Sequence, residues 1–245
     1  MATSLPSRPR NYFATTHWSV VLNAGHSETT RGKDALAALC ETYWYPLYTY
    51  VRRQGQSPQD AEDLTQGFFA RLLESESLAG VSPEKGKFRT FLLVALKRFL
   101  ANEWHRAQTQ KRGGASFRVP LQGHTAETRY IAEPVEHLTA EKLYERRWAL
   151  TLLDCVLVRL GDEFDTPEKK ELFKKLKPYL MAEKGAIPYA DAAIALSMNE
   201  GALKVAVHRL RRRFRELFRE EVAQTVARSE EIEDEIRHLL SVFGP

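Results

Sequence analysis

The amino-acid sequence predicts an all-α protein with two helical domains joined by a flexible linker. Apolar residues recur at helical spacing in nearly every periodic segment, and no alternating β-branched run with hairpin turns occurs. The chain has 245 residues, 43% of them hydrophobic and 28% charged, which suits a folded protein of two modest domains. Residues 113–138 carry Gly, Pro and polar side chains without periodicity, so we expect the linker there.

The N-terminal domain, residues 1–112, is expected to hold helices over about 34–54, from Ser57 onward, and over about 88–105. The second of these has the clearest start in the chain, because Ser57 can cap it and Asp60 completes an S-x-x-D capping box. In the last helix we expect one side to be lined by Phe91, Ala95, Phe99 and Trp104.

The C-terminal domain, residues 139–220, should begin with a long amphipathic helix that ends at Gly161. A helix over 167–181 follows, and Pro178 should disturb it. A short helix, a tight turn and a long basic helix capped by Asn199 complete the domain. This order is the helix-turn-helix pattern, which makes the domain a candidate for binding duplex DNA.

The basic helix separates its apolar and cationic residues. Residues 204–220 hold seven Lys or Arg against two Glu. At 100° per residue one buried stripe is formed by Leu203, Val207, Leu210 and Phe214, and the opposite face carries Lys204, His208, Arg211 and Arg212. Such a helix can enter the major groove, with Lys204 and His208 as base readers and the arginines on phosphates. A solvated helix face is the alternative that composition leaves open.

A second cluster interleaves cations with aromatic and amide side chains. Its members are Lys97, Arg98, Asn102, Trp104, His105 and Arg106. Rings that stack on bases, beside cations that follow the backbone, suit single-stranded DNA. The alternative is that Phe99 and Trp104 belong to the core, which we expect for Phe99 and leave open for Trp104.

Enzymatic, metal and membrane functions find no support in the sequence. The seven histidines are scattered, and the motifs of zinc proteases, serine hydrolases and P-loop enzymes are missing. Cys40 and Cys155 lie far apart, so no disulfide framework or zinc site is indicated. The longest apolar run, residues 91–96, is too short to cross a bilayer. We therefore expect a cytoplasmic protein with no catalytic residues, no metal and no cofactor.

The order of motifs resembles that of a bacterial RNA polymerase sigma factor of the extracytoplasmic-function (ECF) type. The resemblance is carried by YWYPLYTYVRR, DAEDLTQGFF and FRTFLLVALKRFLANEW, followed by a linker and the helix-turn-helix, and it covers about residues 13–220. It implies a non-catalytic subunit that binds the clamp and flap regions of core RNA polymerase and recognises promoter DNA. An anti-sigma protein is a further partner that the resemblance allows.

The resemblance also assigns roles to residues. Helical spacing puts Asp63 and Gln66 outside the stripe of Leu64, Phe68 and Leu72. The resemblance implies that these two residues, the polymerase pair, bind core RNA polymerase. It implies that the minus-ten set, Lys97, Arg98, Asn102, Trp104, His105 and Arg106, meets the melted promoter strand. It implies that the minus-thirty-five set reads duplex DNA: Glu200, Lys204, His208, Arg211 and Arg212. Ser197 departs from the family pattern, because such turns often carry Gly there.

Other interpretations remain open at this stage. The chain could be a stand-alone helix-turn-helix regulator whose N-terminal domain senses a ligand or dimerises, and which protects a palindromic operator without polymerase. A helical enzyme that acts on DNA is a weaker alternative.

The C-terminal extension, residues 221–245, has six acidic and two basic side chains and is expected to form an amphipathic helix capped by Ser229. It should either pack on the C-terminal domain or shield the basic residues Arg211, Arg212 and Arg215.

Overall fold

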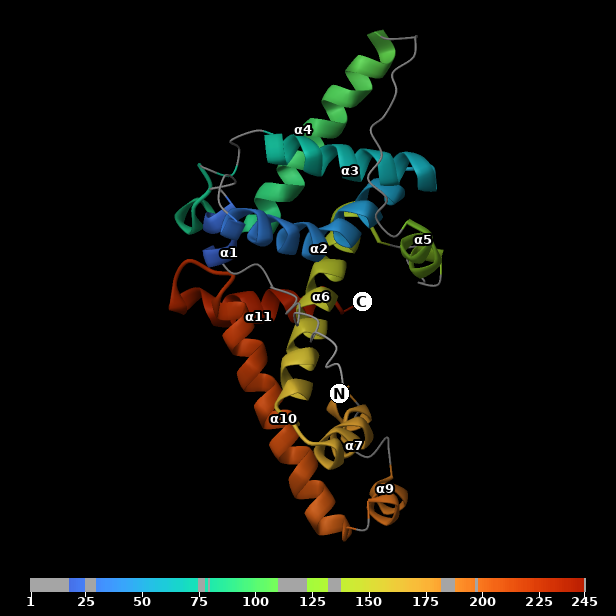
Figure 1. Cartoon of the computed structure of the whole chain (residues 1–245), viewed down its shortest axis with the longest axis vertical. Coiled ribbons are helices and arrows are strands. Elements are labelled where there is room, and N and C mark those ends of the chain that lie inside the picture. Colours follow the sequence, from blue (N-terminus) through green and yellow to red (C-terminus); the bar gives the residue numbers. More distant parts are fainter. Residues whose placement is uncertain are drawn as a thin grey trace, which may run out of the picture.

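The computed structural model describes residues 18–24, 30–74, 78, 80–109, 123–131, 138–181, 188–196 and 198–244. Every regular element in these ranges is helical, which confirms the predicted all-α class (Figure 1). The elements, with η marking short 3₁₀ helices, are α1 (Trp18–Ala24), α2 (Thr30–Arg53), α3 (Pro58–Glu74), η2 (Pro83–Lys85), α4 (Phe88–Thr109), α5 (Gly123–Ile131), α6 (Ala140–Asp162), α7 (Pro167–Leu176), α8 (Pro178–Met181), α9 (Tyr189–Ala195), α10 (Glu200–Ala223), η3 (Ser229–Glu231) and α11 (Ile232–Ser241).

Several helix boundaries follow directly from local chemistry. The backbone N–H of Asp60 donates to Ser57 Oγ at 3.1 Å, and the Ser57 hydroxyl donates to Asp60 Oδ2 at 2.6 Å, so the predicted capping box starts α3. The backbone N–H of Ala202 donates to Asn199 Oδ1 at 2.7 Å, which confirms the predicted cap of α10. Pro178 separates α7 from α8 as expected, because proline cannot continue the helical hydrogen bonding. Ser197 lies outside the described residues.

The predicted apolar side of α4 was wrong, because the buried positions follow the predicted ones by one residue. The buried stripe is Phe88, Leu92 and Leu96, each at most 2% exposed, whereas Phe91, Ala95 and Phe99 are half-buried on its flank. Trp104 is 63% exposed and does not belong to the core. In Figure 1 the last turns of α4 project beyond α3.

The two halves of the chain share one hydrophobic core. α6 packs against α2 more extensively than any other pair of described helices does. Within this contact Trp148 Nε1 donates to Tyr43 Oη at 3.0 Å, and α6 is also joined to α4, because the Tyr144 hydroxyl donates to the carbonyl of Arg89 at 2.9 Å. All three aromatic or indole rings are buried. The N-terminal domain expected at 1–112 and the C-terminal domain expected at 139–220 are therefore packed against each other in this structure.

The first described helix, α1, had no counterpart in the sequence prediction. Trp18 packs edge-on against Phe88, with ring centroids 6.3 Å apart, and its backbone N–H donates to the carbonyl of Gln224 at 3.2 Å. Val21 is fully buried against the same core. α1 therefore connects the N-terminal half with the end of α10.

Part of the expected linker is helical. Within residues 113–138 the structure describes α5, which docks on α2 because Glu127 accepts hydrogen bonds from Arg52 at 2.8 and 2.9 Å and from the Tyr48 hydroxyl. The hydrogen bonds from Arg52 hold the pKa of Glu127 below its ordinary value. Residues 113–122 and 132–137 lie outside the described ranges.

The C-terminal extension packs on the folded chain. α11 lies against α10 and α6, which favours the packing alternative over the shielding of Arg211, Arg212 and Arg215. Its acidic residues pair elsewhere: Glu233 with Arg219 of α10, and Glu235 with Lys87 and Arg89. The expected cap by Ser229 was wrong. A 3₁₀ turn precedes α11, and its N-cap residue Glu231 makes no side-chain capping bond.

Candidate nucleic-acid interface

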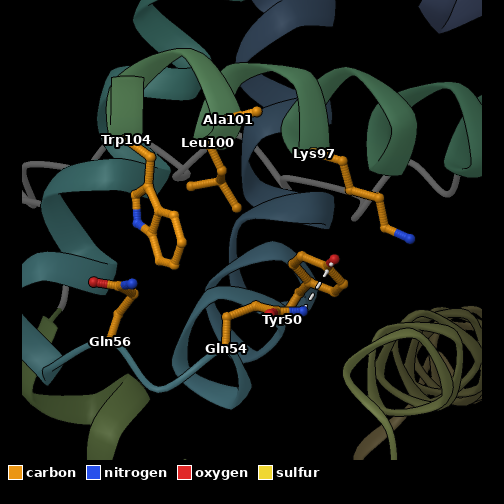
Figure 2. Close-up of a pocket in the computed structure, with 7 residues that line it drawn as sticks. All are labelled: Tyr50, Gln54, Gln56, Lys97, Leu100, Ala101 and Trp104. Atoms are coloured by element: carbon orange, nitrogen blue, oxygen red, sulfur yellow. Dashed lines mark hydrogen bonds between the residues drawn. The ribbon is translucent and has the colours of Figure 1, made fainter. Parts of the chain in front are cut away.

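The outer part of α4 carries an exposed aromatic ring beside a pocket. A pocket of about 200 Å³ lies between α4 and the end of α2. Figure 2 shows Trp104 and Lys97 reaching from α4 toward the far wall, on either side of Leu100. That wall is formed by Tyr50, Gln54 and Gln56, and the Gln54 amide donates to Tyr50 Oη at 3.2 Å. The pocket thus combines a ring that can stack with amides that can donate and accept hydrogen bonds.

The charged residue of the minus-ten set that lines this pocket is Lys97. Lys97 Nζ lies 2.7 Å from Glu141 Oε1 of α6 and 5.8 Å from the centroid of the Tyr50 ring. The hydrogen bond to Glu141 raises the pKa of Lys97. Asn102 and His105 are exposed, and Arg106 pairs with Glu103 one turn earlier at 2.9 Å. Arg98 lines a second, open pocket of about 630 Å³ between α4 and residues 80–87. The structure therefore gathers the whole minus-ten set on one helix.

The first half of α10 presents the minus-thirty-five set at the opposite end of the molecule (Figure 1). Leu203, Val207 and Leu210 are buried as predicted, with Phe214 half-buried. Lys204 and His208 are exposed, and Val205 beside them is 50% exposed. Lys204 Nζ lies 3.2 Å from Glu200 Oε2, and Arg212 Nε lies 3.6 Å from Glu216 Oε1, so both cations pair along the helix surface. These exposed ion pairs are weak and exchangeable.

Arg211 differs from the other members of this set. Its guanidinium donates to the carbonyl oxygen of Tyr179 from Nε at 2.9 Å and from Nη2 at 2.6 Å. Tyr179 is buried in α8 and stacks on Tyr189 of α9, with ring centroids 5.1 Å apart. Arg211 therefore attaches α8 to the recognition helix here, and its expected phosphate contact stays a prediction.

The polymerase pair lies on α3 outside the buried positions. Asp63 and Gln66 are half-buried, and each forms a side-chain contact one turn away, with Gln59 and Glu62 respectively at 3.3 Å. On the inner side of α3 the buried residues are Ala61, Thr65, Phe68 and Leu72. Leu64, expected inside, is only half-buried.

Sequence reasoning missed the far wall of the pocket. Gln54 and Gln56 follow α2, and no charge pattern or motif marked them, whereas Tyr50 lies in the YWYPLYTYVRR motif but was given no role. The chain turns at Gly55, just after α2, where φ is +87°, and this turn brings Gln54 and Gln56 to the wall opposite Trp104.

Within the described ranges, no cluster of three or more His, Cys, Asp or Glu side chains is arranged to hold a metal ion. In the same part of the chain, no helix is both long and apolar enough to cross a membrane.

An all-α chain with an aromatic and cationic surface on one long helix and a basic recognition helix on another defines a nucleic-acid-binding protein. Residues 39–110 match the family model of sigma-70 region 2. The matched segment runs from α2 to the end of α4 and contains the polymerase pair, the pocket and the minus-ten set. No curated protein and no solved structure gave a significant match.

The match supports a sigma factor of the sigma-70 family, with a role in transcription initiation. It implies two partners, core RNA polymerase and promoter DNA.

Proposed function

We propose that this protein is a sigma factor of the ECF type, which directs core RNA polymerase to promoters and helps melt them. In this proposal residues 1–112 bind the polymerase clamp and the minus-ten strand, and residues 139–220 bind the flap and the minus-thirty-five duplex. Residues 113–138 connect the two parts, and residues 221–245 are a C-terminal extension. The protein would act in the cytoplasm, where an anti-sigma protein could also bind it.

The exposed ring of Trp104 is the observation that carries the proposal. It is 63% exposed beside a pocket whose other wall offers two glutamine side chains, and it lies within the segment that matches sigma-70 region 2. A large aromatic ring held in solvent next to cations costs burial energy and is suited to stack on an unpaired base. This arrangement supports capture of the minus-ten strand as it leaves the duplex.

The capped start of α10 supports duplex recognition. Asn199 caps the first turn, and Lys204 and His208 project into solvent from this helix, as residues that read base edges in the major groove must. Val205, exposed between them, offers an apolar surface to a thymine methyl group.

The proposal is tested by polymerase binding. Asp63→Ala combined with Gln66→Ala should weaken co-purification with core polymerase without lowering the thermal midpoint, since neither side chain belongs to the core. Glu74→Ala, an exposed carboxylate on the same helix, is the matched control and should bind normally. Equal retention of core polymerase by the double variant and the control would reject the role given to this pair. Protection of a palindromic operator by the chain alone would instead favour a stand-alone regulator.

A further inference from the structure

A group of ion pairs joins the two halves through the C-terminal extension. Arg89 of α4 donates to Glu145 of α6 at 2.8 Å and also to Glu235 of α11. Lys87, two residues earlier, donates to the other oxygen of Glu235. We call Lys87, Arg89, Glu145 and Glu235 the latch. It connects the segment matching region 2 with two helices of the C-terminal half.

The central pair of the latch, Arg89 and Glu235, is buried on both sides, which distinguishes it from the other ion pairs described in the chain. The side chains of Arg89 and Glu235 are 3% and 1% exposed, and the Arg89 guanidinium lies 4.4 Å from the centroid of the Trp148 ring. Buried charges are held in place because separating them leaves each without a partner in a medium of low polarity. The latch therefore defines one arrangement of the halves.

The same interface occupies groups that DNA would need. Lys97 of the minus-ten set pairs across the interface with Glu141 of α6, at the edge of the pocket under Trp104. With the halves closed, a carboxylate of the C-terminal half lies against this cation and competes with promoter phosphate for it.

The closed arrangement is also too short for a promoter. The start of α4 and the end of α10 meet at Trp18, which contacts Phe88 and Gln224. At 1.5 Å per helical residue, the segments from Phe88 to the middle of the minus-ten set and from Gln224 to the middle of the minus-thirty-five set are about 20 and about 27 Å long, so with the link through Trp18 the two middles are at most about 70 Å apart. Promoter elements centred 25 base pairs apart are separated by about 85 Å of duplex. Both sets cannot bind one promoter while the halves are closed.

We infer that the C-terminal extension is an autoinhibitory latch, in which Glu235 holds the region 2 segment against α6 until core polymerase and promoter DNA separate them. This inference rests on the proposed function for what opens the latch, but the closed state itself can be measured without polymerase. Release of the latch should expose Lys97 and increase the fraction of chains able to bind.

The test begins with the distance between the halves. Fluorophores are attached to Ala70→Cys on α3 and Lys170→Cys on α7, both exposed. Cys40 and Cys155 should stay unlabelled, because burial raises the pKa of these thiols to about 11 and about 12. Energy transfer is then compared between the unmodified extension, Glu235→Gln and a truncation after Arg228, with helicity monitored by circular dichroism.

The matched control is Glu233→Gln, which removes an exposed carboxylate of the same helix whose partner, Arg219, lies within the C-terminal half. We expect Glu235→Gln and the truncation to lower energy transfer, and Glu233→Gln to leave it unchanged. Unchanged transfer in both latch variants would overturn the inference whatever polymerase does. If both variants lose helicity, the test uses the chain with the unmodified extension. Saturating core polymerase should then lower the energy transfer of this chain, and unchanged transfer would overturn the inference.

Binding forms the second arm, with core polymerase and with a short single-stranded oligothymidine as probes. Apparent affinity scales with the fraction of open chains, so the latch variants should bind both probes about tenfold more tightly. Lower energy transfer with unchanged affinity for the oligothymidine would overturn the inhibitory role. Loss of energy transfer and tighter oligothymidine binding, with no polymerase binding by any variant, would keep the latch and reject the sigma-factor proposal.

Discussion

The ion pairs between the two halves and those on the DNA-facing helices use the same residue types under opposite conditions. Arg89 and Glu235 are almost fully buried, whereas Lys204 and Glu200 are 57% and 52% exposed. The first pair crosses from one half to the other, and the second joins neighbouring turns of one helix. Exposed pairs contribute about 0–1 kcal/mol and can be exchanged for phosphate, while buried pairs are costly to break. Charge on this molecule therefore has two separate tasks, holding a conformation and binding DNA.

Among the changes to the buried ion pairs, Arg89→Ala should have the largest effect. It leaves Glu235 and Glu145 without their shared partner and removes the contact with the Trp148 ring. We expect the free energy of unfolding to fall by about 3–5 kcal/mol, measured by chemical denaturation. Arg106→Ala, which breaks an exposed pair on the same helix, should stay within about 0.5 kcal/mol. A loss below about 1 kcal/mol for Arg89→Ala would show that the latch is not the main connection.

Acid should release the latch more gradually. Burial alone would raise the pKa of Glu235, but Arg89 and Lys87 more than offset it and hold its pKa below the ordinary value of 4.5. Because the folded-state pKa is lowered, this stabilisation is present above pH 4.5 and is lost as the pH falls through the folded-state value. Glu145 of α6 is the other carboxylate on Arg89.

The measurement is the energy transfer between the halves from pH 7 down to 3. His238, which lies 3.5 Å from Glu145, is replaced by Gln so that Glu145 has an uncharged neighbour at this position throughout. The chain with Glu235 should open below pH 4.5, and Glu235→Gln should lose this acid step. An identical acid profile in both chains would assign the transition to other carboxylates.

Trp104→Ala tests the exposed, DNA-facing surface of α4. The ring is in solvent, so the thermal midpoint should not change, but each base that it stacks would lose about 1–3 kcal/mol. Permanganate footprinting of the promoter bubble is the measurement, with Trp104→Phe as the control that keeps a stacking ring. A normal bubble in Trp104→Ala would remove this residue from promoter melting.

The smallest effects are expected at single exposed cations of α10. Arg212→Ala should weaken binding of minus-thirty-five duplex and reduce the salt dependence by about 0.9 in the logarithmic slope, as loss of one phosphate contact requires. Lys204→Ala should instead reduce discrimination between base sequences. Lys174→Ala, on exposed α7, is the control and should change neither quantity. A salt slope that stays constant in Arg212→Ala would place this arginine away from the phosphates.

Features set by neighbouring residues were predictable, and features set by tertiary contacts were not. The caps by Ser57 and Asn199 and the break at Pro178 are determined within a few residues and were confirmed. The position of Trp104 depends on where α4 leaves the body of the protein. The pocket depends on where α2 turns back, and periodicity records neither.

The position of Glu235 in the sequence could have indicated a buried ion pair. Glu235 belongs to the acidic run of the extension, yet it is spaced three residues from Ile232 and four from Leu239, on the apolar side of the helix. A carboxylate within such a stripe indicates a buried partner. Nothing in the sequence around Arg89 identified that partner, because the two residues are 146 positions apart.

The small helix in the linker sets how far the halves can travel after release. An extended residue adds about 3.4 Å to the contour length of a chain, and a helical one about 1.5 Å. While Glu127 keeps α5 on Arg52, eight residues separate α5 from α6, and a chain of that length spans at most about 27 Å. Undocking of α5 lengthens the connection by the residues between α4 and α5. The maximum separation of the two halves therefore depends on whether α5 is docked. The Arg52–Glu127 pair determines how far the C-terminal half can move to reach its promoter element.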